Sequence, residues 1–236
     1  MLWSIQILGD DGSTSIYDLM KSAAQQVMSK VYELRTYKIY PHYYKQFLGL
    51  TQEHLYLRTA HSKLLGYWTS ELGGLNEVFH IWEYESLEQR GEVRTKLAND
   101  PRWISDYFSK ILPMMSVQEN SVCQLYPGTD LSFSKSKGGS AYNLVTLRFK
   151  AHQSAWKKCF EDLLQELNNA GHLTACFDTI HGRINEVVLL VQHTSLSQGA
   201  DLVQKLSSFT QAEQLWSSLS EASSKLMTPF AISPLQ

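Results

Sequence analysis

The chain has 236 residues, of which 43% are hydrophobic and 19% charged, and its formal net charge is −2. This balance is typical of a folded protein rather than a disordered one, and a nearly neutral chain has no global field to attract nucleic acid or an acidic membrane surface. No apolar run approaches the roughly 20 residues that a membrane-spanning helix needs.

The first 29 residues contain an amphipathic segment. Ser15 is placed to cap a helix, and apolar residues from Ile16 to Met28 recur at spacings of three and four. A cleavable mitochondrial presequence is rich in Arg and poor in acidic residues, whereas this segment has no Arg and three Asp. We therefore interpret it as a helix that packs on the domain.

Residues 30–126 predict the order strand, helix, strand, strand, helix, strand. The segment VYELRTYKI is rich in β-branched and aromatic residues, as strands are. Pro41 suits the first turn of a helix, and the pair Gly73-Gly74 indicates a hairpin. The expected strands cover 31–39, 63–72, 76–84 and 116–126, and the expected helices run from Pro41 to about Arg58, from a Ser86 cap through Lys96, and onward from Pro101.

Residues 127–140, PGTDLSFSKSKGGS, are turn formers and small polar residues, which predicts a linker. Residues 141–236 then repeat the element order. The expected strands cover 141–149, 173–180 and 186–194, the expected helical regions cover 154–170 and 197–226, and 227–236 is expected to be a short edge strand that contains proline.

Two pairs of similar segments indicate a tandem duplication. VYELRTYKI (31–39) returns in weakened form as AYNLVTLRFK (141–150), and GGLNEVFHIWEYES (73–86) returns as HGRINEVVLLVQHTS (181–195). The two offsets, about 110 and about 109 residues, agree, so the chain is predicted to hold two copies of one unit of roughly 100 residues. We divide it into an N-terminal extension (1–29), a first copy (30–126), a linker (127–140) and a degenerate second copy (141–236).

The element order βαββαβ is the ferredoxin-like arrangement, whose sheet carries helices on one face only. The other face must be covered, and in a tandem protein the sheet of the sister copy is available to cover it. We predict an α+β fold in which tandem ferredoxin-like units form a dimeric α/β-barrel-type pseudo-dimer within one chain. Packing alone explains such a duplication.

The segment HLYLRTAHSKLLGYWTSELGGLNEVFHIWEYESLEQR (54–90) closely resembles the core motif of the NIPSNAP domain. VYELRTY before it and DPRW (100–103) after it fit the same pattern, and the LRTAHS form is most similar to the third NIPSNAP subgroup. The second copy resembles the degenerate second domain of that family. The resemblance implies a dimeric α+β-barrel fold, mitochondrial association and roles in protein interaction, including the marking of damaged mitochondria for autophagy (mitophagy). It implies no established reaction.

The strand VFHIWEY (78–84) alternates, so that His80 and Trp82 share one face. A mixed polar and aromatic face suits a pocket lining better than a dry core, and Arg35 joins it if its strand has the same phase. The alternative is an ordinary core with one satisfied histidine. The candidate binding pocket comprises Arg35, Arg58, His61, Trp68, His80, Trp82 and Tyr84.

In the second copy the positions of His80 and Trp82 are occupied by Leu189 and Val191. This replacement turns a polar and aromatic face into a plain apolar one. A pocket is therefore expected in the first copy only.

Other chemistries have little support. His54 and His61 lie on one helix face, but seven residues rise about 10.5 Å, whereas the ligands of one ion lie about 2 Å from it, so we expect no metal site. His61 beside Ser62 has no acid placed to orient it, which argues against a nucleophile and for a turn histidine. Neither G-x-G-x-x-G nor a P-loop occurs, so nucleotide binding lacks a motif. The widely spaced cysteines form no CxxC and are interpreted as structural thiols: Cys123, Cys159 and Cys176.

The leading hypothesis is a non-enzymatic, mitochondria-associated interaction or scaffold protein. It acts in mitochondrial quality control or trafficking, uses no cofactor and binds mitochondrial or autophagy-related proteins, with homo-oligomers and a cytosolic location as open alternatives. No nucleic-acid partner is expected.

A second hypothesis rests on fold analogy, because the same barrel architecture hosts small monooxygenases and haem enzymes. The chain is then a small-molecule or haem-binding barrel protein with cofactor-independent monooxygenase-like chemistry. In that case Arg58, His61 and His80, together with Trp82, orient or polarise a small apolar or aromatic ligand. A third hypothesis is a lipid-surface role for the N-terminal helix.

Overall fold

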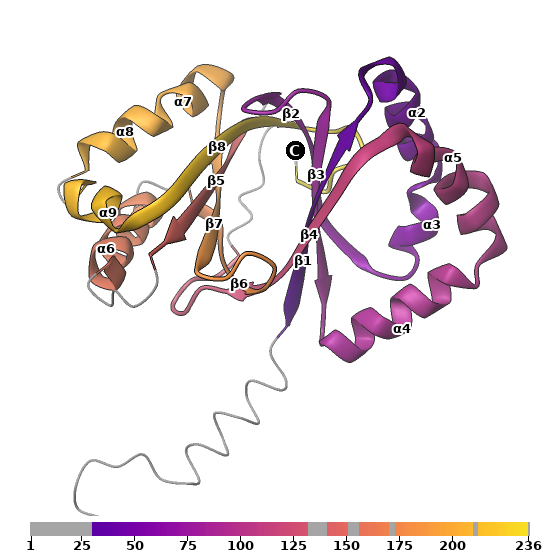
Figure 1. Ribbon diagram of the computed structural model, residues 1–236, viewed down its shortest axis with the longest axis horizontal. Coiled ribbons are helices and arrows are strands. Elements are labelled where there is room, and N and C mark those ends of the chain that lie inside the picture. Colours follow the sequence, from indigo (N-terminus) through magenta and orange to yellow (C-terminus); the bar gives the residue numbers. More distant parts are fainter. Residues whose placement is uncertain (1–29, 132–140, 151–155, 170–172, 210–211, 236) are drawn as a thin grey trace, which may run out of the picture.

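The computed structural model describes residues 30–131, 141–150, 156–169, 173–209 and 212–235. The helix predicted over 15–28 and most of the predicted linker lie outside these residues. Within them, antiparallel strands close into a barrel in the order β1-β3-β2-β8-β5-β7-β6-β4. Helices α2–α5 cover one side of the barrel and α6–α9 cover the opposite side (Figure 1).

The strand predictions over the first seven strands agree with the structure to within one or two residues. The strands are β1 (Val31–Ile39), β2 (Lys63–Leu72), β3 (Glu77–Tyr84), β4 (Met115–Leu125), β5 (Ala141–Phe149), β6 (Leu173–His181), β7 (Glu186–His193) and β8 (Leu219–Pro229). The α-helices are α2 (Tyr44–His54), α3 (Tyr56–Thr59), α4 (Leu87–Ala98), α5 (Ser109–Ile111), α6 (Trp156–Asn169), α7 (Leu196–Ala200), α8 (Leu202–Ser208) and α9 (Ala212–Ser218). Short turns of other helix types are η1 (Pro41–Tyr43), η2 (Trp103–Phe108, a π-helix) and η3 (Leu112–Met114).

Each half of the chain supplies four neighbouring strands of the barrel. The first half contributes β4-β1-β3-β2, and the second contributes β8-β5-β7-β6. The halves meet at two seams, where β2 pairs with β8 and β4 pairs with β6. The seams are short: β2 pairs with β8 through Trp68, Thr69, Ser70 and Leu72, and β4 pairs with β6 from Val122 to Leu125. Each half therefore covers part of both open edges of the other.

Equivalent positions in the two halves adopt the same local structure. Ser86 accepts a hydrogen bond from the Gln89 backbone N–H at the start of α4, and Ser195 accepts one from Gln198 at the start of α7. The β2–β3 and β6–β7 hairpins also share a backbone conformation. Asn76 and Asn185, which follow the same turn, both have positive φ angles, of 56° and 59°, a conformation that asparagine tolerates.

Three apolar clusters form among the described residues. One lies between the first-half sheet and its helices, one lies between the second-half sheet and its helices, and the third lies in the barrel interior. Alternation along each strand sends successive side chains to the helix layer and to the barrel interior. The large side chains of the interior are Trp68, Phe79, Tyr142, Phe177 and Met227.

The prediction of a helix over 197–226 is wrong at its C-terminal end. The helices end at Ser218, and Leu219–Pro229 form β8, which pairs with β5 along one edge and with β2 along the other. Glu221, Ala222 and Lys225 are good helix formers, but their pairing with β5 overrides this preference. Of the edge strand expected over 227–236, residues 227–229 are the end of β8, which pairs there with β2 and, at Met227, also with β5, and 230–235 form no strand.

In the part of the chain that the structure describes, no helix has both the length and the apolar character that a membrane crossing requires.

The cysteine thiols are expected to be unreactive in the folded protein. Cys123, Cys159 and Cys176 are buried and form no disulfide, and burial raises the pKa of Cys123 to about 12 and that of Cys176 well above its ordinary value. Because the thiolate is the reactive form, we expect Ellman's reagent to label none of them in native buffer and all three in guanidinium chloride. Rapid labelling of the native protein would contradict this placement.

Candidate functional site

A cavity of about 240 Å³ lies between the helix-facing side of the first-half sheet and the helices that cover it. Strands β1, β2 and β3 form its floor, and α4 and the π-helix η2 form much of its wall. Short π-helical turns are rare and often occur at functional sites. The lining residues that carry charge or aromatic rings are Arg35, Tyr37, Arg58, Tyr67, His80, Trp82, Arg94, Trp103, Tyr107 and Phe108.

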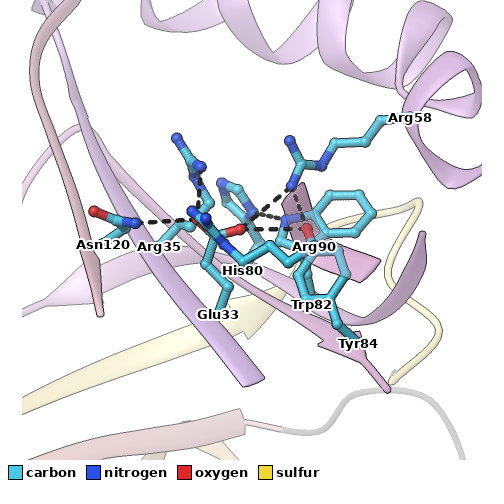
Figure 2. A network of polar contacts seen from close by, with 8 residues as sticks. All are labelled: Glu33, Arg35, Arg58, His80, Trp82, Tyr84, Arg90 and Asn120. Carbon is cyan, nitrogen blue, oxygen red and sulfur yellow. Dashed lines mark hydrogen bonds and ion pairs between the residues drawn. The ribbon is translucent and has the colours of Figure 1, made fainter. Parts of the chain in front are cut away.

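A fully buried carboxylate, that of Glu33 on β1, organises the polar groups beside this cavity (Figure 2). Its oxygens accept hydrogen bonds from Arg90 at 2.6 Å and from Arg35 at 2.9 Å, and Arg58 Nη2 lies 3.5 Å away. Asn120 Nδ2 donates at 3.1 Å. One carboxylate thus holds guanidinium groups from β1, α3 and α4.

Burial by itself raises the pKa of Glu33, but the surrounding guanidinium groups, Arg35 foremost, outweigh it and lower the pKa to about 2. The pKa of the unfolded chain is near the ordinary 4.5. Because the folded-state pKa is the lower one, ionised Glu33 stabilises the fold above pH 4.5, and this contribution is lost as the pH falls toward 2.

Arg58 is fixed by two further contacts on β3. Its Nη2 donates to the Tyr84 hydroxyl at 2.9 Å, and its guanidinium carbon lies 4.2 Å from the centre of the Trp82 ring. The Tyr84 hydroxyl in turn donates to Glu33 at 3.3 Å. A guanidinium group stacked on an indole gains cation–π attraction and has little freedom to move.

His80 lies at the floor of the cavity, between aromatic rings. Its ring stacks on Tyr67 with centroids 4.9 Å apart and meets the Tyr37 ring edge-on at 4.8 Å. Burial, and then the positive charges of Arg35 and Arg58, hold the pKa of His80 well below its usual value of 6.5. The imidazole is therefore neutral at physiological pH.

The tautomer of His80 follows from its neighbour. Trp82 Nε1 donates to His80 Nδ1 at 2.6 Å, and an indole N–H can only donate. Nδ1 is then the acceptor, so the proton of the neutral ring lies on Nε2. This Nε2–H is buried and has no hydrogen-bond partner among the described residues.

The structure brings four of the seven candidate pocket residues to the cavity lining: Arg35, Arg58, His80 and Trp82. Tyr84 lies beneath the lining, bonded to Arg58 and Glu33. His61 lies outside it, with its Nε2 3.9 Å from Asp100.

Trp68 faces the barrel interior instead of the cavity, where its ring packs against Phe79 and Tyr142. The reason is a β-bulge between Leu64 and Gly66, which shifts the phase of β2 by one residue. The bulge turns Tyr67 toward the helices and Trp68 inward. In a strand that alternates strictly from Leu64, Trp68 lies on the helix side and Tyr67 faces the barrel interior.

Sequence reasoning missed Glu33, Tyr67 and Arg90, together with the aromatic wall of η2. Glu33 has one usable signal, since it precedes Arg35 by two positions and must share its strand face. Its contact with Arg90 joins residues far apart in the sequence, which no local pattern reveals.

The second half has an apolar counterpart of this site. In the register of β5 and β7, Val145 lies opposite Leu189, as Arg35 lies opposite His80 in the first half. Val145, Leu189 and Val191 belong to the buried cluster beneath the second-half helices. The polar and aromatic arrangement is thus a feature of the first half.

The neutral state of His80 predicts a pH dependence of stability. Below pH 6.5 the unfolded chain binds a proton at this histidine that the folded protein does not bind, so the free energy of unfolding falls by up to about 1.4 kcal/mol per pH unit. We expect His80→Gln to remove this slope between pH 6.5 and 5 in urea unfolding. His42→Gln, at an exposed position, is the control and should leave the slope in place. An unchanged slope in His80→Gln would count against a buried neutral ring.

Residues 32–129 match the family model named NIPSNAP. Human Protein NipSnap homolog 3A is 36% identical over 163 residues, which cover 67% of this chain and 65% of the human protein. Mouse Protein NipSnap homolog 3B is 34% identical over 163 residues, which cover 67% of this chain and 65% of the mouse protein. The chain thus matches less than two thirds of the length of these relatives.

Solved structures with low identity share the fold. A candidate monooxygenase from Fusobacterium nucleatum has a TM-score of 0.63 over 87% of this chain and 94% of its own, at 7% identity. An anthrone oxidase-like protein has a TM-score of 0.59 over 85% of this chain and 91% of its own, at 8% identity. These similarities show a common α+β barrel. Together, the matched domain and the human and mouse relatives show that the chain belongs to the NIPSNAP family.

Proposed function

We propose that the first half of this protein binds a small molecule in the cavity between its sheet and helices, and that the second half is its structural partner. The observation that carries the proposal is the buried His80 Nε2–H, which belongs to a residue of the cavity lining and has no partner among the described residues. An unsatisfied buried donor costs about 1–3 kcal/mol. A bound acceptor removes that cost.

The composition of the cavity supports binding. Its walls are mainly aromatic and aliphatic, with a few polar groups that converge on its floor, as in known ligand sites. Its volume of about 240 Å³ lies below the range of about 300–1,000 Å³ that is common for drug-sized ligands. This size favours a molecule with about one ring over a haem macrocycle.

The role of the second half is inferred from packing. The strand order β4-β1-β3-β2 in one half and β8-β5-β7-β6 in the other supports two ferredoxin-like units that form a pseudo-dimer. In this arrangement the domains correspond to 30–126 and 141–236. The similarity to a candidate monooxygenase, at 7% identity, concerns the fold, so the proposal is binding rather than a reaction.

Family membership supports a second role, as a mitochondria-associated interaction protein in quality control or trafficking. A surface feature agrees with contact to other proteins. The β2–β3 hairpin exposes Leu72 and Leu75, of which Leu75 is 77% accessible.

A thermal-shift assay with the full chain tests ligand binding. We expect members of a panel of neutral, anionic and cationic single-ring compounds to raise the melting temperature, because a ligand that binds only the folded state stabilises it. Ala98→Trp, at an exposed position on the cavity wall, should abolish the shift by filling the space. Ala200→Trp, at an exposed helix end of the second half, should leave it unchanged, and an absence of shifts across the panel would end the proposal.

Subcellular fractionation tests the second role. We expect tagged full-length protein to be recovered with mitochondria, and N-terminal sequencing of the recovered protein shows whether the N-terminal segment has been removed. A tagged cytosolic protein serves as the control. Recovery in the cytosol alone would contradict mitochondrial association.

A further inference from the structure

The guanidinium groups around Glu33 exceed the negative charge that balances them. Arg35, Arg58 and Arg90 all lie within 3.5 Å of this one carboxylate, and their side chains are only 11%, 7% and 19% exposed. No other acidic side chain of the described residues forms an ion pair with them. Buried charge without a counter-charge is costly, so the cluster favours a further anion.

The cavity itself adds positive charge and no negative charge. Arg35, Arg58 and Arg94 line it, and among the described lining residues none is Asp or Glu. Arg94 is an exposed residue of α4. A site lined in this way attracts anions and repels cations.

Three buried N–H donors of the lining lack partners among the described residues: Arg35 Nε, Arg58 Nε and His80 Nε2. All three side chains are almost fully buried. The Arg35 side chain is 11% exposed and the Arg58 side chain 7%, and His80 as a whole residue is 3% exposed. All three groups can only donate in their present state. Their natural complement is a pair of oxygen acceptors.

We propose that the ligand of this cavity is a small organic carboxylate, with its two oxygens at Arg58, Arg35 and His80 Nε2 and its apolar or aromatic body against η2. This inference rests on the proposed binding function and adds the chemical class of the ligand. The two oxygens of a carboxylate accept from these three donors, and its single charge complements the surrounding guanidinium groups. The rings of Trp103, Tyr107 and Phe108 provide the apolar wall.

The test is isothermal titration calorimetry of the full chain with three compounds of one shape: benzoate, benzamide and benzamidinium. These differ in charge at a constant size, so shape cannot explain a difference among them. We expect benzoate to bind at least about tenfold more tightly than benzamide, since a hydrogen bond to a charged group is worth more than a neutral one. Benzamidinium should not bind. Hexanoate and cyclohexanecarboxylate, each with its amide, extend the series to apolar bodies without an aromatic ring.

Two variants provide a matched pair. Arg58→Gln and Arg90→Gln each remove one guanidinium group from Glu33, but only Arg58 lines the cavity. We expect Arg58→Gln to weaken binding of the acid by about tenfold to a hundredfold and Arg90→Gln to change it less than threefold. Arg58→Lys keeps the charge but lacks the Nε donor, so we expect it to bind the acid more weakly than the unaltered protein does. It replaces Arg58→Gln as the test variant if Arg58→Gln fails to fold.

The outcomes separate this inference from the binding function. If amides bind as tightly as their acids, or if inorganic phosphate binds as tightly as benzoate, the carboxylate assignment is wrong although a ligand site remains. Equal losses in Arg58→Gln and Arg90→Gln also overturn it. If no acid, amide or other compound of the panel binds, both the inference and the proposed function fail.

Discussion

The ion cluster around Glu33 is the constraint on which the first half depends. It joins β1 to α3 and α4 and brings Asn120 of β4 to the same carboxylate. A cluster of this kind requires that Glu33 remain ionised, which the depressed pKa ensures. Removal of one arginine leaves the others to compensate, whereas removal of Glu33 leaves three buried cations without a counter-charge. The same carboxylate therefore supports the fold and sets the electrostatics of the cavity.

The closed barrel explains how this polar cluster is tolerated. The barrel interior contains large apolar side chains such as Trp68 and Tyr142, and the second-half helices cover a second apolar cluster. These two cores and the apolar cluster of the first-half helix layer all supply hydrophobic burial, which is the main favourable term in folding. The first-half helix layer can then hold charged groups and a cavity at a tolerable loss of stability.

Much of the architecture could be predicted from the sequence because local signals were strong. Alternation and turn residues located the first seven strands, and the Ser86 cap fixed the start of α4. The prediction failed at β8, where pairing with β2 and β5 overrides a helical composition. It also misplaced Trp68, because a bulge marked only by Gly66 reverses the phase of β2. The shared face of His80 and Trp82 was accessible from alternation, whereas the place of Arg35 on it depends on the register between β1 and β3. The role of Glu33 likewise depends on contacts between distant segments.

The apolar counterpart of the site in the second half has a consequence for stoichiometry. An assembly of two identical units carries two equal sites, and occupation of one can alter the other through their common barrel. In this chain the matching face presents Leu189 and Val191, so one polypeptide offers one such site. For the proposed ligand, saturation is then expected to follow a simple hyperbola with a ratio of one to one, and any cooperativity is expected to arise between separate chains.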